Sequence, residues 1–275
     1  MKKSRNLLYS FLGAGLLIFG GCQVTEESHG TLKVSITDAP FPIEIIEEAN
    51  VTITKVEVRM KSDTSDATFT TLMEESRDIN LLDLRNGVVS ELLEMEMPAG
   101  TYDLIRVYVE NASLKIIDGE TYEVKVPSGS QTGIKIFIQP ELRIEGGLTS
   151  EVLLDFNLEK SFVVRGNPMT PAGIKGFNFK PVIRAVNNST AGSVEGMVSD
   201  TASAVLANAA VWIAQDSTIA SAFTDSTGYY AIPGIPEGFY SLYSSKENYD
   251  TVMYENVEIV AGNRIDMDFV LTPTE

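Results

Sequence analysis

The sequence predicts an all-β protein built as two antiparallel β-sandwich-like domains that follow a short N-terminal leader. From Thr31 onward, apolar and polar residues alternate with a period of two, which is typical of strands with one buried face. Glycine and proline separate the alternating segments at short intervals, as in sandwiches and barrels. The 275 residues, 44% hydrophobic and 21% charged, are enough for about two ordered domains.

Residues 1–21 have the organisation of a signal peptide. Three basic residues at positions 2, 3 and 5 precede an apolar run over residues 7–19, and two glycines end the segment. A basic start, a short apolar run and small residues at the end are the three parts of a secretory signal peptide. The apolar run is too short to span a bilayer, which takes ~20 residues. We therefore expect this segment to be removed from the mature protein.

Cys22 is the only cysteine, and it follows the two glycines directly. The order of leader, small residues and cysteine resembles the lipobox of bacterial lipoproteins, with Phe19 where that family usually has leucine. The resemblance implies that Cys22 is acylated and becomes the first residue of the mature chain. The polar neighbours "QVTEES" offer neither an apolar packing site nor the cationic setting that activates a thiol. Residues 22–30 are therefore expected to be the lipidated cysteine and a polar tether.

The expected location is the bacterial outer membrane, with the protein lipid-anchored and on the cell surface; a periplasm-facing orientation is the alternative. Gln23 is not the aspartate associated with inner-membrane retention in some lipoproteins, and the stretch with Glu26 and Glu27 resembles a surface-export signal. The formal net charge of −17 makes nucleic acid a poor partner, because binding it requires a basic surface. The expected partners are the membrane, through the acyl anchor on Cys22, and a glycan or an envelope protein.

Residues 31–186 are expected to form the first β domain. The apolar set in "VTITKVEVRM" slips by one residue near Thr54 and Lys55, as it does at a β-bulge. The segments "GTLKVSITDAP", "MPAGTYDLIRVYV", "LDFNLEKSFVV" and "FKPVIRAV" resemble an uncharacterised domain family of bacterial envelope lipoproteins. That family brings no established activity. It more typically has a second aspartate where Asn157 stands, and this departure weakens a proposed acid pair with Asp155.

Residues 187–191 are small and polar, which suits a linker, and residues 192–275 are expected to form the second β domain. The segments "GSVEGMV", "LANAAVWI" and "FTDSTGYYAIPGIPEGFYSLYSS" resemble the carboxypeptidase regulatory-like domain. This is a small transthyretin-like sandwich related to starch-binding-like folds. The resemblance implies a scaffold with no catalytic residue to carry over.

Few side chains suit catalysis or metal binding. His29 is the only histidine, and it lies in the expected tether, whereas a catalytic triad or a zinc site needs histidine in a packed scaffold. Carboxylates are plentiful, and Asp38, Asp155 and Glu159 are candidates for a hydrolytic pair, although nothing in the sequence marks two of them. The prediction is therefore a protein that is not an enzyme, with no catalytic residue, cofactor or metal ligand.

Aromatic residues of the second domain offer a route to a binding surface. Tyr243, Tyr249 and Tyr254 lie near expected loops, and exposed rings hold sugars by stacking. The sequence therefore predicts a non-enzymatic, membrane-anchored binding or structural module, with carbohydrate as the ligand that the starch-binding-like fold suggests. Two alternatives stay open: an envelope hydrolase that uses carboxylates or a metal, and a purely structural spacer in an adhesin or envelope complex.

Overall fold

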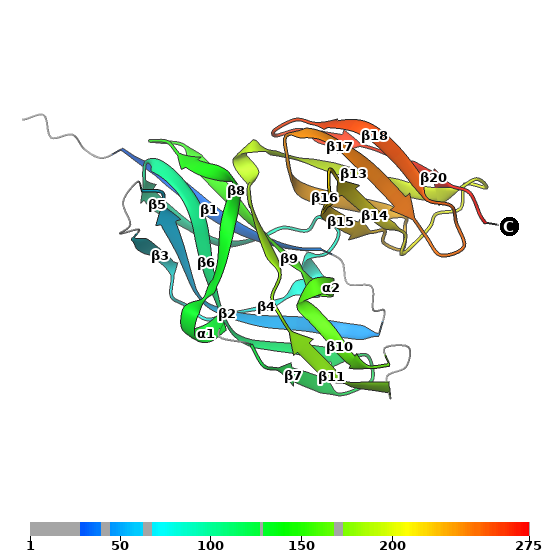
Figure 1. Ribbon diagram of the computed structural model, residues 1–275, viewed down its shortest axis with the longest axis horizontal. Helices are drawn as coiled ribbons and strands as arrows, with labels where there is room; N and C mark the ends of the chain where they lie inside the picture. The colour runs from blue at the N-terminus through cyan, green and yellow to red at the C-terminus, as the bar shows by residue number, and fades with distance from the viewer. Residues whose placement is uncertain (1–27, 40–44, 63–67, 127–128, 168–172, 275) are drawn as a thin grey trace, which may run out of the picture.

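The computed structural model describes residues 28–39, 45–62, 68–126, 129–167 and 173–274 (Figure 1). Strands make up 68% and helices 6% of the structure, so the predicted all-β class is confirmed. The expected signal peptide and Cys22 lie outside the described residues. Within the described ranges, no helix has the length and apolar character that crossing a bilayer requires.

Twelve of the strands form the first domain, and its described residues include three short helices. Ten strands make one sheet: β1 (His29–Ala39), β2 (Ile46–Met60), β3 (Phe69–Met73), β4 (Arg77–Asn80), β5 (Ser90–Pro98), β6 (Gly100–Ile116), β7 (Thr121–Val124), β8 (Ile134–Ile144), β9 (Thr149–Asn157) and β12 (Ile183–Asn187). A separate hairpin pairs β10 (Phe162–Gly166) with β11 (Ile174–Phe179). The helices are η1 (Leu81–Leu84), α1 (Gly129–Thr132) and α2 (Leu158–Ser161).

The large sheet is rolled around a single core. Its strand order is β3-β2-β6-β8-β12-β9-β1-β5, with β4 beside β2 and β7 beside β6. Val58 near one end of this order and Leu92 at the other belong to the same buried hydrophobic cluster. Leu32, Val34 and Ile36 of β1 are also in that cluster, on the common face that their alternation predicts.

The predicted bulge near Thr54 and Lys55 is confirmed. Ile53 lies opposite Val109 of β6, and Lys55 lies opposite Tyr108, so Thr54 is the extra residue. The segments "TYDLIRVYVE" and "ASLKII" read as two strands, but they form the single 17-residue β6. A second bulge explains this, because Thr52 and Ile53 lie opposite Asn111 and Val109 and skip Glu110, which restores the alternation beyond it.

The second domain is a sandwich of two small sheets. Its strands are β13 (Ala191–Asp200), β14 (Ala210–Ala214), β15 (Thr218–Phe223), β16 (Tyr229–Pro236), β17 (Gly238–Ser245), β18 (Val252–Ile259), β19 (Arg264–Asp266) and β20 (Phe269–Leu271). One sheet has the order β16-β13-β19 with β20 beside β13, and the other has the order β15-β14-β17-β18. Val194, Tyr230 and Phe269 of the first sheet and Val211 and Leu242 of the second share one core.

The sheets differ from the expected purely antiparallel arrangement, because each domain also contains parallel pairs. β1 pairs parallel with β9, and β12 pairs parallel with β8. In the second domain, β13 pairs parallel with β19 and with β20. Parallel partners are joined by long connections rather than tight turns, so local alternation does not reveal them.

Each domain contains a tyrosine corner with the spacing Pro-x-Gly-x-Tyr. The hydroxyl of Tyr102 donates to the carbonyl oxygen of Pro98 at 2.9 Å, and the hydroxyl of Tyr240 donates to that of Pro236, also at 2.9 Å. The two corners join β5 to β6 and β16 to β17. A hydroxyl that bonds back to the backbone a few residues upstream fixes the angle between consecutive strands.

The expected linker at residues 187–191 is an ordered turn that contains the helix η3 (Asn188–Thr190). The side chain of Asn187 accepts a hydrogen bond from the backbone N–H of Ser189 at 3.2 Å and donates to the carbonyl of Glu141 at 3.0 Å. The hydroxyl of Ser189 in turn accepts from the backbone N–H of Glu151 at 2.8 Å. These bonds attach the connection to the first domain.

The two domains are in direct contact beside this turn. Leu153 and Val186 lie on the outer face of the large sheet, are almost fully buried and belong to neither core. The amide of Asn86 donates to the carbonyl of Tyr229 at 3.1 Å and accepts from the N–H of Ala231 at 2.7 Å, as a neighbouring strand would. The next residue must be glycine, because a Cβ at Gly87 would lie 2.6 Å from the Cβ of Ala231.

Candidate functional site

An aromatic row crosses the outer face of the sheet β15-β14-β17-β18. The pleat directs Val211 and Leu242 into the core and Trp212 and Tyr243 to the opposite face. The cross-strand register places Ser221, Trp212, Tyr243 and Met253 in one line. The rings of Trp212 and Tyr243 are parallel within 3°, with centroids 5.1 Å apart, which is an offset stack.

Met253 and Phe239 extend this surface with large apolar side chains. We call the set of Ser221, Trp212, Tyr243, Met253 and Phe239 the aromatic face. The side chain of Met253 is 45% exposed and that of Phe239 is 59% exposed. Burying large apolar side chains is favourable, so a set of them on a solvent-facing sheet is a typical feature of a binding surface.

Of the three tyrosines selected from the sequence, only Tyr243 lies on this face. Tyr254 pairs opposite the core residue Leu242, its ring lies 4.9 Å from that of Phe269, and its hydroxyl donates to the carbonyl of Asp268. Tyr249 is half-buried against the second core and forms an isolated bridge with Pro273. The structure thus pairs Tyr243 with Trp212 and places Tyr249 and Tyr254 at the rim of the sandwich.

The first domain contains two buried carboxylates that lie on opposite faces of the large sheet. On the adjacent parallel strands β1 and β9, Asp38 lies opposite the core residue Phe156, whereas Asp155 lies opposite Thr37. The two residues are 5% and 8% exposed. Arg184 of β12 donates from Nε and Nη2 to one oxygen of Asp155, at 3.1 and 2.7 Å. Its Nη1 donates to the carbonyl of Gly234 in the second domain at 2.8 Å. One guanidinium therefore holds a buried carboxylate and the domain contact together.

Asp38 is the buried carboxylate that has no ion pair among the described residues. Neither carboxylate oxygen accepts a hydrogen bond of regular geometry from the described residues. Burial raises the pKa of the Asp38 carboxyl well above its usual value, and the charge of Asp155 raises it further. Arg85 and the nearby backbone N–H of Leu158 lower this pKa and offset only part of the increase.

The other residues considered for chemistry lie apart from these two carboxylates. Glu159 is exposed on α2. Asn157, which stands where the resembling family more typically has aspartate, caps that helix by accepting from the N–H of Lys160 at 2.8 Å. His29 is exposed at the start of β1, opposite Pro98, so the expected tether overlaps the first strand by two residues. Among the described residues, no group of three or more His, Cys, Asp or Glu side chains is placed to hold a metal ion.

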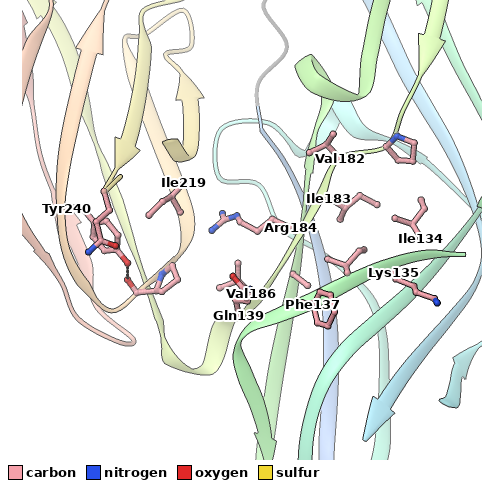
Figure 2. A pocket seen from close by; sticks show the side chains of 15 residues that line it. Ile134, Lys135, Phe137, Gln139, Val182, Ile183, Arg184, Val186, Ile219 and Tyr240 are labelled. Carbon is pink, nitrogen blue, oxygen red and sulfur yellow. Dashed lines mark hydrogen bonds between the residues drawn. The ribbon is translucent and has the colours of Figure 1, made fainter. Parts of the chain in front are cut away.

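A groove of about 660 Å³ lies between the two domains (Figure 2). Residues of β8 and of the segment around β12 line one part of it, and residues of the second domain line the other. The lining is mainly apolar and includes Ile134, Phe137, Ile183, Ile219 and Tyr240. Arg184 is part of the lining, whereas Asp38 and Asp155 are not. No pattern in the sequence indicates this groove, because its walls meet only in the folded chain.

Comparison with known proteins assigns families to the two domains. Residues 29–181 match the domain of unknown function DUF4382, and residues 193–272 match the carboxypeptidase regulatory-like domain. Both resemblances expected from the sequence are therefore confirmed. No curated protein matches the chain.

Solved structures show only weak likeness. The Bacillus anthracis TIE protein is 15% identical with a TM-score of 0.26, and the match covers 90% of this chain and 34% of that one. The shaft pilin SpaA from Lactobacillus rhamnosus GG is 10% identical with a TM-score of 0.28, covering 90% and 98%. A cohesin–X-dockerin complex from Acetivibrio cellulolyticus is 22% identical with a TM-score of 0.25, covering 30% and 58%.

These likenesses assign no activity, and the chain spans about a third of the Bacillus protein and less than two thirds of the Acetivibrio chain. The family matches carry more weight, because they span nearly all the described residues of both domains. Since the first match alone takes in more than half of the sequence, this chain belongs to the DUF4382 family and carries a carboxypeptidase regulatory-like domain after it.

Proposed function

We propose that this protein is a non-catalytic, membrane-anchored module that binds a glycan on the aromatic face of its second domain. The single observation that carries the proposal is the stacked pair of Trp212 and Tyr243 on a solvent-facing sheet. Tyrosine and tryptophan combine a large apolar ring with a polar group, which suits them to sugar rings that have apolar faces and hydroxyl edges.

The cross-strand order suggests where the sugar binds. One face of the Trp212 ring is covered by Tyr243, and the neighbour of Trp212 on its other side is Ser221. Serine is too small to cover an indole, so this second face of Trp212 is available for stacking above Ser221. Met253 occupies the equivalent place beside Tyr243. We therefore assign the main contact to Trp212.

Replacing Trp212 with alanine is expected to weaken glycan binding by roughly tenfold or more, because a central aromatic anchor carries a large share of binding energy. Ser221→Leu should have a similar effect by filling the space above Ser221 while leaving Trp212 in place. Retention on immobilised polysaccharides and a glycan array would measure the loss. Since Trp212 is the only tryptophan, its fluorescence reports ligand stacking directly in the unmodified protein.

Variants at Tyr249 and Tyr254 separate this site from the rim of the sandwich. With a glycan on the aromatic face, the Tyr249→Ala, Tyr254→Ala double variant should bind normally. If the double variant loses glycan binding while Trp212→Ala binds normally, the glycan site lies at the rim of the sandwich. No retention of any glycan by the wild-type protein would contradict the proposal.

The anchor is proposed on the leader and Cys22 described above. A Cys22→Ser variant should lose membrane association. Stable anchoring requires more than one acyl chain, and in the lipobox pattern the cysteine is the residue that carries these chains. Cell fractionation, with mass spectrometry of the mature N-terminus, would measure this. A His29→Ala variant is the control and should stay in the membrane fraction. Continued membrane association of the Cys22→Ser protein would contradict an acyl anchor.

Two features support binding rather than hydrolysis. A hydrolytic carboxylate pair faces one shared space that holds substrate and water, whereas Asp38 and Asp155 are enclosed on opposite faces of the sheet and Arg184 binds Asp155. The groove between the domains does not include either carboxylate. A spacer without a ligand remains the outcome if the wild-type protein retains no glycan.

A further inference from the structure

We propose that the opening between β8 and β12 binds an extended peptide segment of a partner protein by β-strand addition. The preferred segment alternates apolar and acidic residues. This site is separate from the aromatic face, and it rests on the topology of the first domain. Figure 2 shows Ile134 and Ile183 between the two strands, with Ile219 and Tyr240 on the side of the second domain.

The two strands pair over only a short distance. β12 and β8 are parallel neighbours at Ala185 with Ile138 and at Val186 with Gln139. Before these positions they diverge, and residues 134–137 and 181–184 line the groove. On their far sides both strands are fully paired, β8 with β6 and β12 with β9. The large sheet is therefore open along one line, between two well-supported edges.

Backbone groups face into this opening. The carbonyl of Val182 accepts from the N–H of Asn157 on the β9 side at 2.9 Å. Because successive residues of a strand direct their N–H and C=O groups to opposite sides, those of Ile183 point toward β8. The pairing of Ala185 with Ile138 similarly directs Lys135 and Phe137 toward β12. The described part of the chain gives Lys135 and Ile183 no backbone partner across the opening.

Unpaired backbone donors and acceptors on sheet edges favour a peptide over a sugar or a lipid. An added strand satisfies these groups in a regular ladder, and side-chain pockets alongside provide selectivity. The open part of β8 covers about four residues, or roughly 13 Å of strand. Phe137 is 61% exposed beside it, and the second domain contributes Ile219 and Pro236 as an apolar wall.

A positive side chain at the groove favours a partner segment that carries acidic residues. The charge of Arg184 is matched by Asp155, whereas Lys135 is exposed and has no ion pair among the described residues. Lys135 is thus an unmatched positive group at the groove of a chain with a net charge of −17. An acidic side chain on the added strand would complement it.

The test uses the full-length protein and a fluorescein-labelled peptide of alternating valine and glutamate. The peptide is about six residues long, so that it spans the open part of β8. A second peptide has the same side chains with alternate amides N-methylated. Fluorescence anisotropy should show binding of the first peptide and a loss of roughly tenfold or more for the second, because several backbone hydrogen bonds are removed. Amide exchange at Lys135, Phe137 and Ile183 should slow when the first peptide binds.

Matched variants locate the site. Phe137→Ser should weaken binding by roughly tenfold, and Phe239→Ser, at an equally exposed phenylalanine on the aromatic face, should leave it unchanged. Lys135→Glu should weaken binding by about fivefold, and Lys175→Glu, on β11, should not. All four side chains are exposed, so the fold should be retained.

Two results would overturn the proposal. One is the absence of any peptide binding up to about 1 mM, a concentration at which even weak strand addition is detected. The other is equal affinity for the N-methylated peptide, which would show that side chains alone are recognised. Glycan binding by the same samples reports on the aromatic face independently, so failure of one site leaves the other testable.

Discussion

Replacing Arg184 with alanine is expected to lower the free energy of unfolding by about 3–5 kcal/mol, the cost of leaving a buried charge without its partner. Asp155 is 8% exposed, and both hydrogen bonds that it accepts from Arg184 would be lost. The carbonyl of Gly234 would lose its donor at the same time, which weakens the contact between the domains. Urea unfolding monitored by Trp212 fluorescence and by circular dichroism would measure both effects.

Controls distinguish the buried ion pair from charge in general. Arg264→Ala removes an exposed guanidinium that pairs with Glu195 at 3.2 Å, and it should cost less than about 1 kcal/mol. The double variant Asp155→Asn, Arg184→Met removes both charges and should regain a large part of the stability lost in Arg184→Ala. A cost for Arg184→Ala no larger than that for Arg264→Ala would contradict the proposed role.

Local patterns in the sequence predicted the part of the fold that depends on local structure. The alternation at Leu32, Val34 and Ile36 reflects the buried face of a strand, and the slip at Thr54 reflects an inserted residue. Both effects follow from the two-residue period of the pleat, so they can be read from a short segment. The composition change near residue 187 likewise falls at the junction between the matched domains.

Long-range pairing was not predictable in this way. Asp38 and Asp155 are 117 positions apart, and only the parallel pairing of β1 with β9 places them on neighbouring strands. The same holds for the opening between β8 and β12, which exists because two strands from distant segments meet at two residues and then separate. The spacing of residues along the sequence does not indicate which distant strands pair.

The aromatic face is an intermediate case. The sequence identified the aromatic-rich domain and chose Tyr243, Tyr249 and Tyr254 by their nearness to expected loops. The signal that distinguishes Tyr243 is its parity within a strand, because Leu242 and Ser244 on either side of it are buried. Trp212 has the same relation to Val211 and Ile213, so the pair could have been found from alternation together with the pairing of β14 and β17.

Replacing Asp38 with asparagine is expected to stabilise the protein at pH 8, by about 1–3 kcal/mol, because the variant no longer buries an unpaired carboxylate. Burial and Asp155 raise the pKa of Asp38 in the folded state, while Arg85 lowers it in part. Well below the usual aspartate pKa, the carboxyl is protonated in both the folded and the unfolded states and imposes no penalty. As the pH rises, the unfolded chain ionises first, so wild-type stability falls until the folded-state pKa is passed.

The gain from Asp38→Asn should therefore be largest at alkaline pH and should shrink as the pH falls toward 4, the usual range of an aspartate. Urea unfolding of the wild type and the variant across this pH range would measure the difference. Glu159→Gln, at an exposed carboxylate on α2, is the control and should change stability by less than about 0.5 kcal/mol at any pH. An effect of Asp38→Asn that is the same at acidic and alkaline pH would instead point to the shape of the new amide, since ionisation is the only one of the two causes that depends on pH.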